Sequence, residues 1–116
     1  MIKNEVVEYA NKIRNEFFTS DSKRDANYKT PKDIFRIDNI CYGEDKTWQV
    51  LDLYRPKKFK KKFLPVIVNV HGGGWVYGTK ETYQFYCMSL AQMGFAVLNF
   101  TYRLAPENIF PASLED

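Results

Sequence analysis

The chain has 116 residues, of which 45% are hydrophobic and 16% aromatic, a composition typical of a globular domain that excludes overall disorder. Its 17 basic and 14 acidic residues leave a net charge of +3, a surplus too small to indicate an acidic partner by itself. Cys41 and Cys87 lie far apart, and the sequence has one histidine, so two buried thiols are favoured over a zinc site or a disulfide framework.

The N-terminal sequence does not have the pattern of a signal peptide. Lys3, Glu5 and Glu8 interrupt any apolar segment there, and no stretch of the chain approaches the roughly 18 apolar residues of a membrane span. These features predict a cytoplasmic protein.

The first segment, from Ile2 to Phe18, predicts an amphipathic helix with one face to bury, because its apolar residues recur at spacings of three and four. The residues of that face are Ile2, Val6, Tyr9, Ala10, Ile13 and Phe17. The polar stretch Thr19 to Pro31 is rich in turn formers and is predicted to be a connector. We therefore divide the chain into an N-terminal helix with its connector, residues 1–30, and a main domain, residues 31–116.

Two segments that alternate apolar and polar residues predict an antiparallel strand pair. They are Ile34 to Cys41 and Thr47 to Tyr54, separated by a turn at Gly43. The segment that follows, Arg55 to Lys62, has six basic residues in eight and is predicted to be a solvated loop between strands.

The next three segments predict a βαβ unit. Val66 to Val70 has the dense apolar character of a strand buried on both faces, and Phe95 to Phe100 has the same character. Between them, Thr79 to Met93 predicts a helix that ends at Gly94. The apolar face of that helix is predicted to consist of Tyr83, Tyr86, Cys87, Leu90 and Ala91. A βαβ unit requires a parallel sheet, so the expected fold class is α/β.

The segment with the strongest chemical content, His71-Gly72-Gly73-Gly74-Trp75, lies between the first buried strand and the helix. Three consecutive glycines are costly in backbone entropy, which favours a role in close approach or positive φ. Ester cleavage needs such a segment, because backbone N–H groups must come within about 3 Å of the oxyanion of the tetrahedral intermediate.

This motif resembles the HGGGW signature of the hormone-sensitive-lipase-like esterases, the alpha/beta hydrolase fold-3 group. Tyr102 to Glu107 (YRLAPE) and Phe110 to Asp116 (FPASLED) are similar to a second stretch of that family, and Val50 to Pro56 (VLDLYRP) is similar to its second strand. The resemblance covers roughly residues 34–116, whereas the first thirty residues match the family's cap segment in position only.

The resemblance implies an α/β-hydrolase fold and a serine esterase or lipase that acts on small acyl esters without a metal or cofactor. The backbone N–H groups of Gly73 and Gly74 would be the oxyanion donors, while His71, Gly72 and Trp75 would shape the turn. His71 would be a structural histidine, because the family's catalytic base is a different one. The family's sheet order would begin 1-2-4-3, which leaves Val66 to Val70 as an apolar edge and predicts a tendency to aggregate.

The catalytic triad is missing from the sequence. The family's nucleophile lies in a G-x-S-x-G elbow, and none of the six glycines brackets a serine in that pattern. Pro111 favours the first turn of a helix that has only one turn in this sequence. We therefore expect the oxyanion-hole half of an esterase, with no ester turnover by the chain alone.

Three other functions fit parts of the sequence. Gly73, Gly78, Thr79 and Lys80 approach a phosphate-binding loop, but the last two residues are in the reverse order. A non-catalytic hydrolase-like protein would also lack the triad. Finally, the basic segment 55–62 could bind RNA or an anionic surface, and it would then show salt-sensitive association.

Overall fold

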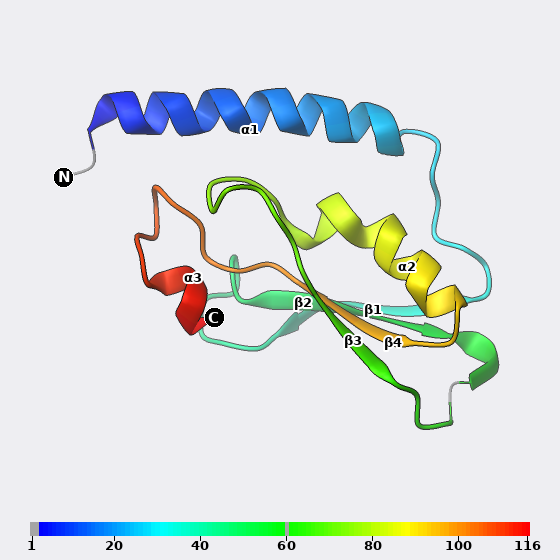
Figure 1. Cartoon of the computed structure of the whole chain (residues 1–116). Coiled ribbons are helices and arrows are strands. Elements are labelled where there is room, and N and C mark those ends of the chain that lie inside the picture. The colour runs from blue at the N-terminus through cyan, green and yellow to red at the C-terminus, as the bar shows by residue number, and fades with distance from the viewer. Residues whose placement is uncertain (1–2, 60) are drawn as a thin grey trace.

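The computed structural model describes residues 3–59 and 61–116, which form one mixed sheet with helices on one side (Figure 1). Helices α1 and α2 both lie on the same side of the sheet, and α1 lies farther from it than α2. The elements in chain order are α1 (Asn4–Asp25), β1 (Ile34–Cys41), β2 (Val50–Pro56), η1 (Lys57–Phe59), β3 (Val66–Val70), η2 (Lys80–Tyr83), α2 (Gln84–Gln92), β4 (Ala96–Phe100) and α3 (Ala112–Glu115).

The sheet has the order β1-β2-β4-β3. Strand β2 pairs antiparallel with both β1 and β4, and β3 pairs parallel with β4. The predicted antiparallel pair, the βαβ unit and the strand order are therefore confirmed. The parallel pairing matters for function, because it brings the loops that follow β3 and β4 to the same end of the sheet.

The predicted bounds of β1 and β3 are correct, but the second strand begins at Val50 and not at Thr47. The carboxylate of Asp45 accepts the backbone N–H groups of Thr47 and Trp48, and the Asp45 carbonyl accepts that of Gln49. These hydrogen bonds extend the turn, because they give the backbone a local alternative to strand pairing.

Helix α1 is longer than predicted, since it continues to Asp25 through residues assigned to the connector. Arg24 forms ion pairs with Asp21 and Asp25, so side chains that favour turns stabilise the last helical turns here. The predicted apolar face is only partly covered. Ala10 is buried, but Tyr9 and Phe17 are more than half exposed. Ile2, also assigned to that face, lies outside the described residues.

The second predicted helix begins with the 3₁₀ turn η2 and continues as α2, and Gly94 follows it with a φ of 107°. Tyr86 was assigned to the buried face but is exposed, whereas Met88 is fully buried. Tyr86 and Met88 both lie within α2, whose buried residues are Cys87, Met88 and Ala91, so the buried face includes Met88 in place of Tyr86. The core that results consists of Ile34, Tyr54, Cys87, Met88, Ala91 and Val97.

Strand β3 was predicted to be buried on both faces, and this is wrong for one face. Val66, Val68 and Val70 have exposed fractions of 59%, 56% and 64%, whereas Ile67 packs against the core under α2. Helix α2 covers one face of the sheet, and β3 is an edge strand, so the apolar edge predicted from the strand order is present.

Two further expectations concerned the burial of the two cysteines and the absence of a membrane span. Cys87 is buried as expected, but Cys41 is exposed, and both are free thiols. Among the described residues, no helix is both long enough and apolar enough to cross a membrane.

Candidate active site

The glycine-rich loop between β3 and η2 lies at the carboxyl end of the two parallel strands. It contacts the loop that follows β4 at two points. The amide of Ala105 donates a hydrogen bond to the carbonyl of Trp75 at 2.9 Å, and the hydroxyl of Tyr102 donates to the carbonyl of His71 at 2.5 Å. The two sequence motifs, HGGGW and YRLAPE, therefore form one structural unit.

Hydrogen bonds within this loop fix the directions of two peptide planes. The Gly72 carbonyl accepts a hydrogen bond from Nδ1 of His71 at 2.8 Å. The Gly73 carbonyl accepts from the backbone N–H groups of Val76 at 3.2 Å and Tyr77 at 3.0 Å. In a trans peptide the C=O of one residue and the N–H of the next point in opposite directions. The N–H groups of Gly73 and Gly74 consequently point away from these partners, and no acceptor among the described residues pairs with either of them.

The loop needs glycine at Gly73 for a steric reason. Its φ is 138°, and a Cβ at this position would lie 1.8 Å from the carbonyl oxygen of Tyr77. Gly74 has a φ of 61° with no atom within 4 Å of a Cβ position, so it needs only the left-handed conformation. Trp75 adopts the same φ of 61° with its side chain exposed, which is rare for a residue that has a Cβ.

His71 is 3% exposed and its ring stacks on that of Tyr102, with 4.3 Å between the ring centroids. A carbonyl can only accept, so the bond to Gly72 places a hydrogen on Nδ1 and leaves Nε2 unprotonated in the neutral ring. Burial lowers the pKa of His71, and the bond to Gly72 offsets this only in part. The buried Nε2 has no partner among the described residues. The ring is therefore neutral and held within its own loop.

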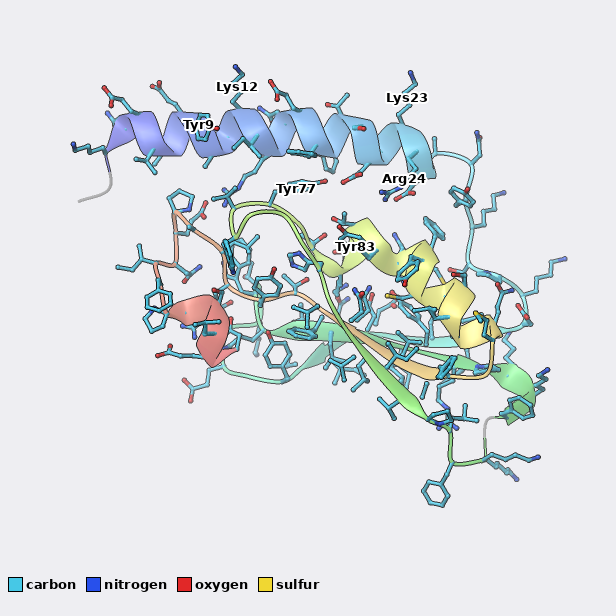
Figure 2. The ribbon with its side chains drawn as sticks, in the orientation of Figure 1. Tyr9, Lys12, Lys23, Arg24, Tyr77 and Tyr83 are labelled. Carbon is cyan, nitrogen blue, oxygen red and sulfur yellow. The ribbon has the colours of Figure 1, made fainter. Side chains whose placement is uncertain are left out.

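A cleft of about 670 Å³ lies between the loop and α1, and Gly72, Gly73 and Gly74 line it. Helix α1 supplies Tyr9, Ile13, Phe17, Asp21 and Arg24, and the remaining lining residues are Val76, Tyr77, Thr82 and Tyr83. Figure 2 shows Tyr77 and Arg24 in the space between α1 and the rest of the chain, whereas Lys12 and Lys23 point away from it. The cleft is therefore largely apolar and aromatic, with charged residues at the C-terminal end of α1.

Tyr77 joins the loop to α1. Its ring stacks on that of Phe17 with 5.4 Å between centroids, and its hydroxyl donates a hydrogen bond to Asp21. Burial, with the hydrogen bond to Asp21, raises the pKa of Tyr77 to about 12, so the hydroxyl stays protonated and acts as the donor. Trp75 points elsewhere, since it lines a separate apolar pocket of about 370 Å³ with residues of the 105–114 segment.

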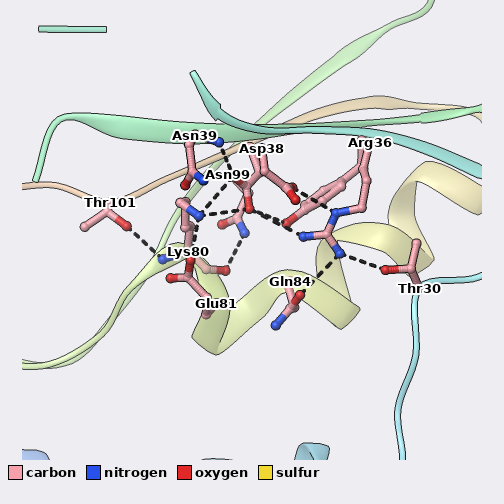
Figure 3. A network of polar contacts seen from close by, with 11 residues as sticks. Thr30, Arg36, Asp38, Asn39, Lys80, Glu81, Gln84, Asn99 and Thr101 are labelled. Carbon is pink, nitrogen blue, oxygen red and sulfur yellow. Dashed lines mark hydrogen bonds and ion pairs between the residues drawn. The ribbon is translucent and has the colours of Figure 1, made fainter. Parts of the chain in front are cut away.

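A buried ion pair anchors the C-terminal end of the loop (Figure 3). Nζ of Lys80 lies 3.0 Å from Oδ1 of Asp52 and 2.5 Å from Oε1 of Glu81, and both Lys80 and Asp52 are buried. Burial lowers the pKa of Lys80, but the two carboxylates outweigh it and raise the pKa above its ordinary value. The Lys80 backbone is also held, because its N–H donates to Thr101 and its carbonyl accepts from Asn99. Lys80 is therefore committed to structure, which argues against the phosphate-binding loop considered in the sequence analysis.

The serines of the chain do not form a nucleophile site. Ser89 lies in α2, and its hydroxyl donates to the carbonyl of Tyr86. Among the described residues, no group of three His, Cys, Asp or Glu side chains is arranged to hold a metal ion.

The basic segment lies far from the cleft. Its described residues form η1 and the flanks of η1 at the opposite end of the sheet from the glycine loop (Figure 1), while Lys60 lies outside the described residues. Arg55 donates to the carbonyls of Phe59 and Lys62, and Nζ of Lys58 lies 4.8 Å from the centroid of the Phe59 ring. These local contacts fit the predicted connecting loop.

Comparison with known proteins shows which family the chain resembles. The BD-FAE family model matches residues 51–116, a span that contains the glycine loop, the buried ion pair and the YRLAPE motif. The chain belongs to the BD-FAE family.

Esterases are among the relatives of this BD-FAE family member. The chain is 36% identical over 78 residues to Esterase LipC of Mycobacterium tuberculosis and 43% identical over 67 residues to Probable carboxylesterase 16 of Arabidopsis thaliana. These matches cover 66% and 54% of the chain but only 19% and 15% of those proteins. The chain therefore spans a fifth or less of the length of these relatives.

Solved structures of esterases have the same fold. The phosphonate-inhibited esterase B of Lactobacillus rhamnosis has a TM-score of 0.88 and 27% identity, over 99% of this chain and 38% of that one. The esterase of Pyrobaculum calidifontis has a TM-score of 0.68 and 32% identity, over 91% of this chain and 34% of that one. The expected α/β-hydrolase fold and the resemblance to an esterase family are confirmed.

Several residues at this site were not identified from the sequence. Arg14, Asp21 and Arg24 of α1 approach the loop from a segment that carries no motif. Tyr102 was visible only as part of a motif, with no indication that its ring would cover His71. These contacts join residues far apart in the chain, and local patterns do not report such pairings.

Proposed function

We propose that the protein is a carboxylic-ester hydrolase that acts on small acyl esters, and that Gly73 and Gly74 form its oxyanion hole. The observation that carries the proposal is the pair of adjacent N–H groups, without acceptors among the described residues, on the wall of the 670 Å³ cleft. The esterase relatives support the same chemistry.

The role of the two amides follows from the charge that develops in the reaction. A serine hydroxyl attacks the ester carbonyl carbon, and the carbonyl oxygen becomes an oxyanion as the tetrahedral intermediate forms. The alcohol leaves, and water then releases the acid from the acyl-enzyme. Donors fixed before the reaction stabilise the oxyanion without reorganisation, and the loss of one donor costs about 3 to 4 kcal/mol.

The remaining residues of the motif would hold the donors in place. His71 fixes the Gly72 carbonyl and so the direction of the Gly73 N–H, and a neutral ring is suited to this because its proton stays on Nδ1. The G-x-S-x-G elbow that carries the family's nucleophile is not present in these 116 residues. We further propose a cytoplasmic location, which the two free thiols support.

The first experiment is to sequence the DNA beyond the Asp116 codon. A reading frame that continues into a G-x-S-x-G elbow supports the proposal. A stop codon would leave the product without a nucleophile, and the non-catalytic alternative would then replace ester hydrolysis.

The second experiment tests the amides directly in the product of the complete reading frame. A phosphonate ester inhibitor that forms a covalent adduct places a charged oxygen where the oxyanion would lie. We expect the amide proton resonances of Gly73 and Gly74 to move downfield in the adduct, while that of Gly94, a distant control, stays in place. Turnover of p-nitrophenyl butyrate with no change at Gly73 or Gly74 would show that the hole lies elsewhere.

A further inference from the structure

The side chain of Arg14, in the middle of α1, connects three segments that are distant in sequence. Its Nε donates to the carbonyl of Val76 at 2.8 Å, and its Nη2 donates to the carbonyl of Ala105 at 2.8 Å. Nη1 and Nη2 also bind the two carboxylate oxygens of Glu107 at 2.7 and 2.8 Å. One guanidinium therefore joins α1 to the glycine loop and to the loop after β4.

The contact with Val76 leads to the Gly74 amide through two peptide planes. The Val76 carbonyl, which Arg14 holds, shares a peptide plane with the N–H of Tyr77. That N–H donates to the Gly73 carbonyl, which in turn shares a plane with the N–H of Gly74. The direction of the Gly74 N–H therefore depends on the direction in which Arg14 holds the Val76 carbonyl. Hydrogen bonds linked in this way also polarise one another.

The geometry of the contact favours a positioning role over a simple surface ion pair. The Arg14 side chain is 24% exposed, and its partners are two backbone carbonyls as well as a carboxylate. A guanidinium can serve all of these at once because its five N–H groups form a rigid planar fork, which a lysine ammonium does not provide. The Ala105 end is itself tied to the loop, since the Ala105 N–H donates to the Trp75 carbonyl.

We propose that Arg14, held by Glu107, is a positioning residue that aims the Gly74 amide into the cleft through the Val76 and Gly73 carbonyls. The proposal rests on the proposed function, because it gives the Gly74 amide a role in the reaction. Arg14 itself acts through the loop and does not line the cleft.

Lys12 provides a control on the same helix. Its side chain is exposed and points away from the cleft (Figure 2). Lys12→Gln therefore reports the general effect of the loss of a positive charge from α1.

The kinetic experiment compares Arg14→Gln, Arg14→Lys and Lys12→Gln in the product of the complete reading frame. An interaction that is made only in the transition state changes kcat, whereas a lost wall of the binding cleft changes KM. We expect both Arg14 variants to lower kcat for p-nitrophenyl butyrate by about 10- to 100-fold, with KM within about 3-fold of wild type. Lys12→Gln should leave kcat within about 3-fold. An equal loss of kcat in Arg14→Gln and Lys12→Gln, or a change in KM alone, would overturn the proposal.

A second measurement does not depend on activity. We expect the backbone ¹H–¹⁵N resonances of Gly74 and Tyr77 to shift in Arg14→Gln and to stay in place in Lys12→Gln. Glu107→Gln keeps Arg14 but weakens its ion pair with residue 107, so it should shift the same resonances by a smaller amount. This variant replaces Arg14→Gln in the test if Arg14→Gln does not fold. If the wild type hydrolyses no ester, the proposed function fails, while the resonances still decide whether Arg14 positions the loop. Unchanged Gly74 and Tyr77 resonances in both variants would show that it does not.

Discussion

The substitution Gly73→Ala tests the conformation of the glycine loop, with Gly74→Ala as its matched control. The two residues are adjacent, and both have positive φ, at 138° and 61°. They differ in what a methyl group would meet. At Gly73 it would lie 1.8 Å from the carbonyl oxygen of Tyr77, which is backbone, while at Gly74 no atom lies within 4 Å.

The expected magnitudes follow from these contacts. Alanine at Gly74 should lower the free energy of unfolding by about 1 to 2 kcal/mol, because only the left-handed conformation is unfavourable there. Alanine at Gly73 has two costs. Its backbone conformation is strained by about 1 to 3 kcal/mol, and its methyl group forces the Tyr77 peptide to move, which costs about the same again. We expect Gly73→Ala to cost at least about 1 kcal/mol more than Gly74→Ala.

Urea unfolding of the chain, followed by circular dichroism at constant pH, measures both values. The amide of Tyr77 gives a local readout, because its hydrogen bond to the Gly73 carbonyl should exchange faster with solvent in Gly73→Ala than in Gly74→Ala. Equal losses of stability, or a larger loss in Gly74→Ala, would show that the loop does not have the close approach of Gly73 to Tyr77 on which the site depends.

Three further predictions concern other parts of the structure. His71 has a lowered pKa in the folded chain, so the unfolded chain binds its proton more readily, and the free energy of unfolding should fall as the pH drops below about 6.5 toward the folded pKa. Since the chain has one histidine, His71→Gln should remove this dependence in urea titrations from pH 7.5 to 5, and a dependence that persists would refute the assignment. Lys80→Met should lower the free energy of unfolding by about 3 to 5 kcal/mol, because it leaves the Asp52 carboxylate buried without its main partner. The double variant Lys80→Met with Asp52→Asn should recover part of this loss. A loss below about 1 kcal/mol for Lys80→Met in thermal or urea unfolding would contradict the prediction. Val68→Lys should reduce self-association of the chain in light scattering while the circular dichroism of the folded chain is retained. Ile67→Lys, on the core side of the same strand, should unfold the chain. A wild-type chain that stays monomeric at high concentration would count against the exposed edge as an association surface.

Local patterns in the sequence predicted much of the sheet and the place of the site. The alternation in Ile34 to Cys41 and the apolar run Val66 to Val70 gave the bounds of two strands, because side-chain period and β-branched content act within a few residues. The three glycines before Trp75 marked the loop, since their backbone requirement is local as well.

Two wrong predictions, the start of β2 and the end of α1, also rested on local patterns. Thr47 and Trp48 alternate with their neighbours like strand residues, but the Asp45 carboxylate takes their amides into a turn. Asp21 and Arg24 resemble connector residues, yet their ion pair lengthens α1. The Asp45 carboxylate outweighed the strand pattern because it binds the backbone N–H groups directly, whereas the ion pair of Arg24 adds a side-chain interaction along the helix.

The sequence by itself determined the α/β class, the strand order expected from the family resemblance, and the segment that carries the two candidate donors. Only the tertiary structure decided that Lys80 is buried against Asp52, that α1 forms a wall of the cleft, and that Arg14 reaches Val76 across 62 positions of sequence. The physical reason is that a charged residue has the same local pattern whether it faces solvent or a partner. Its role is set by which distant carbonyl or carboxylate the fold brings within about 3 Å of it.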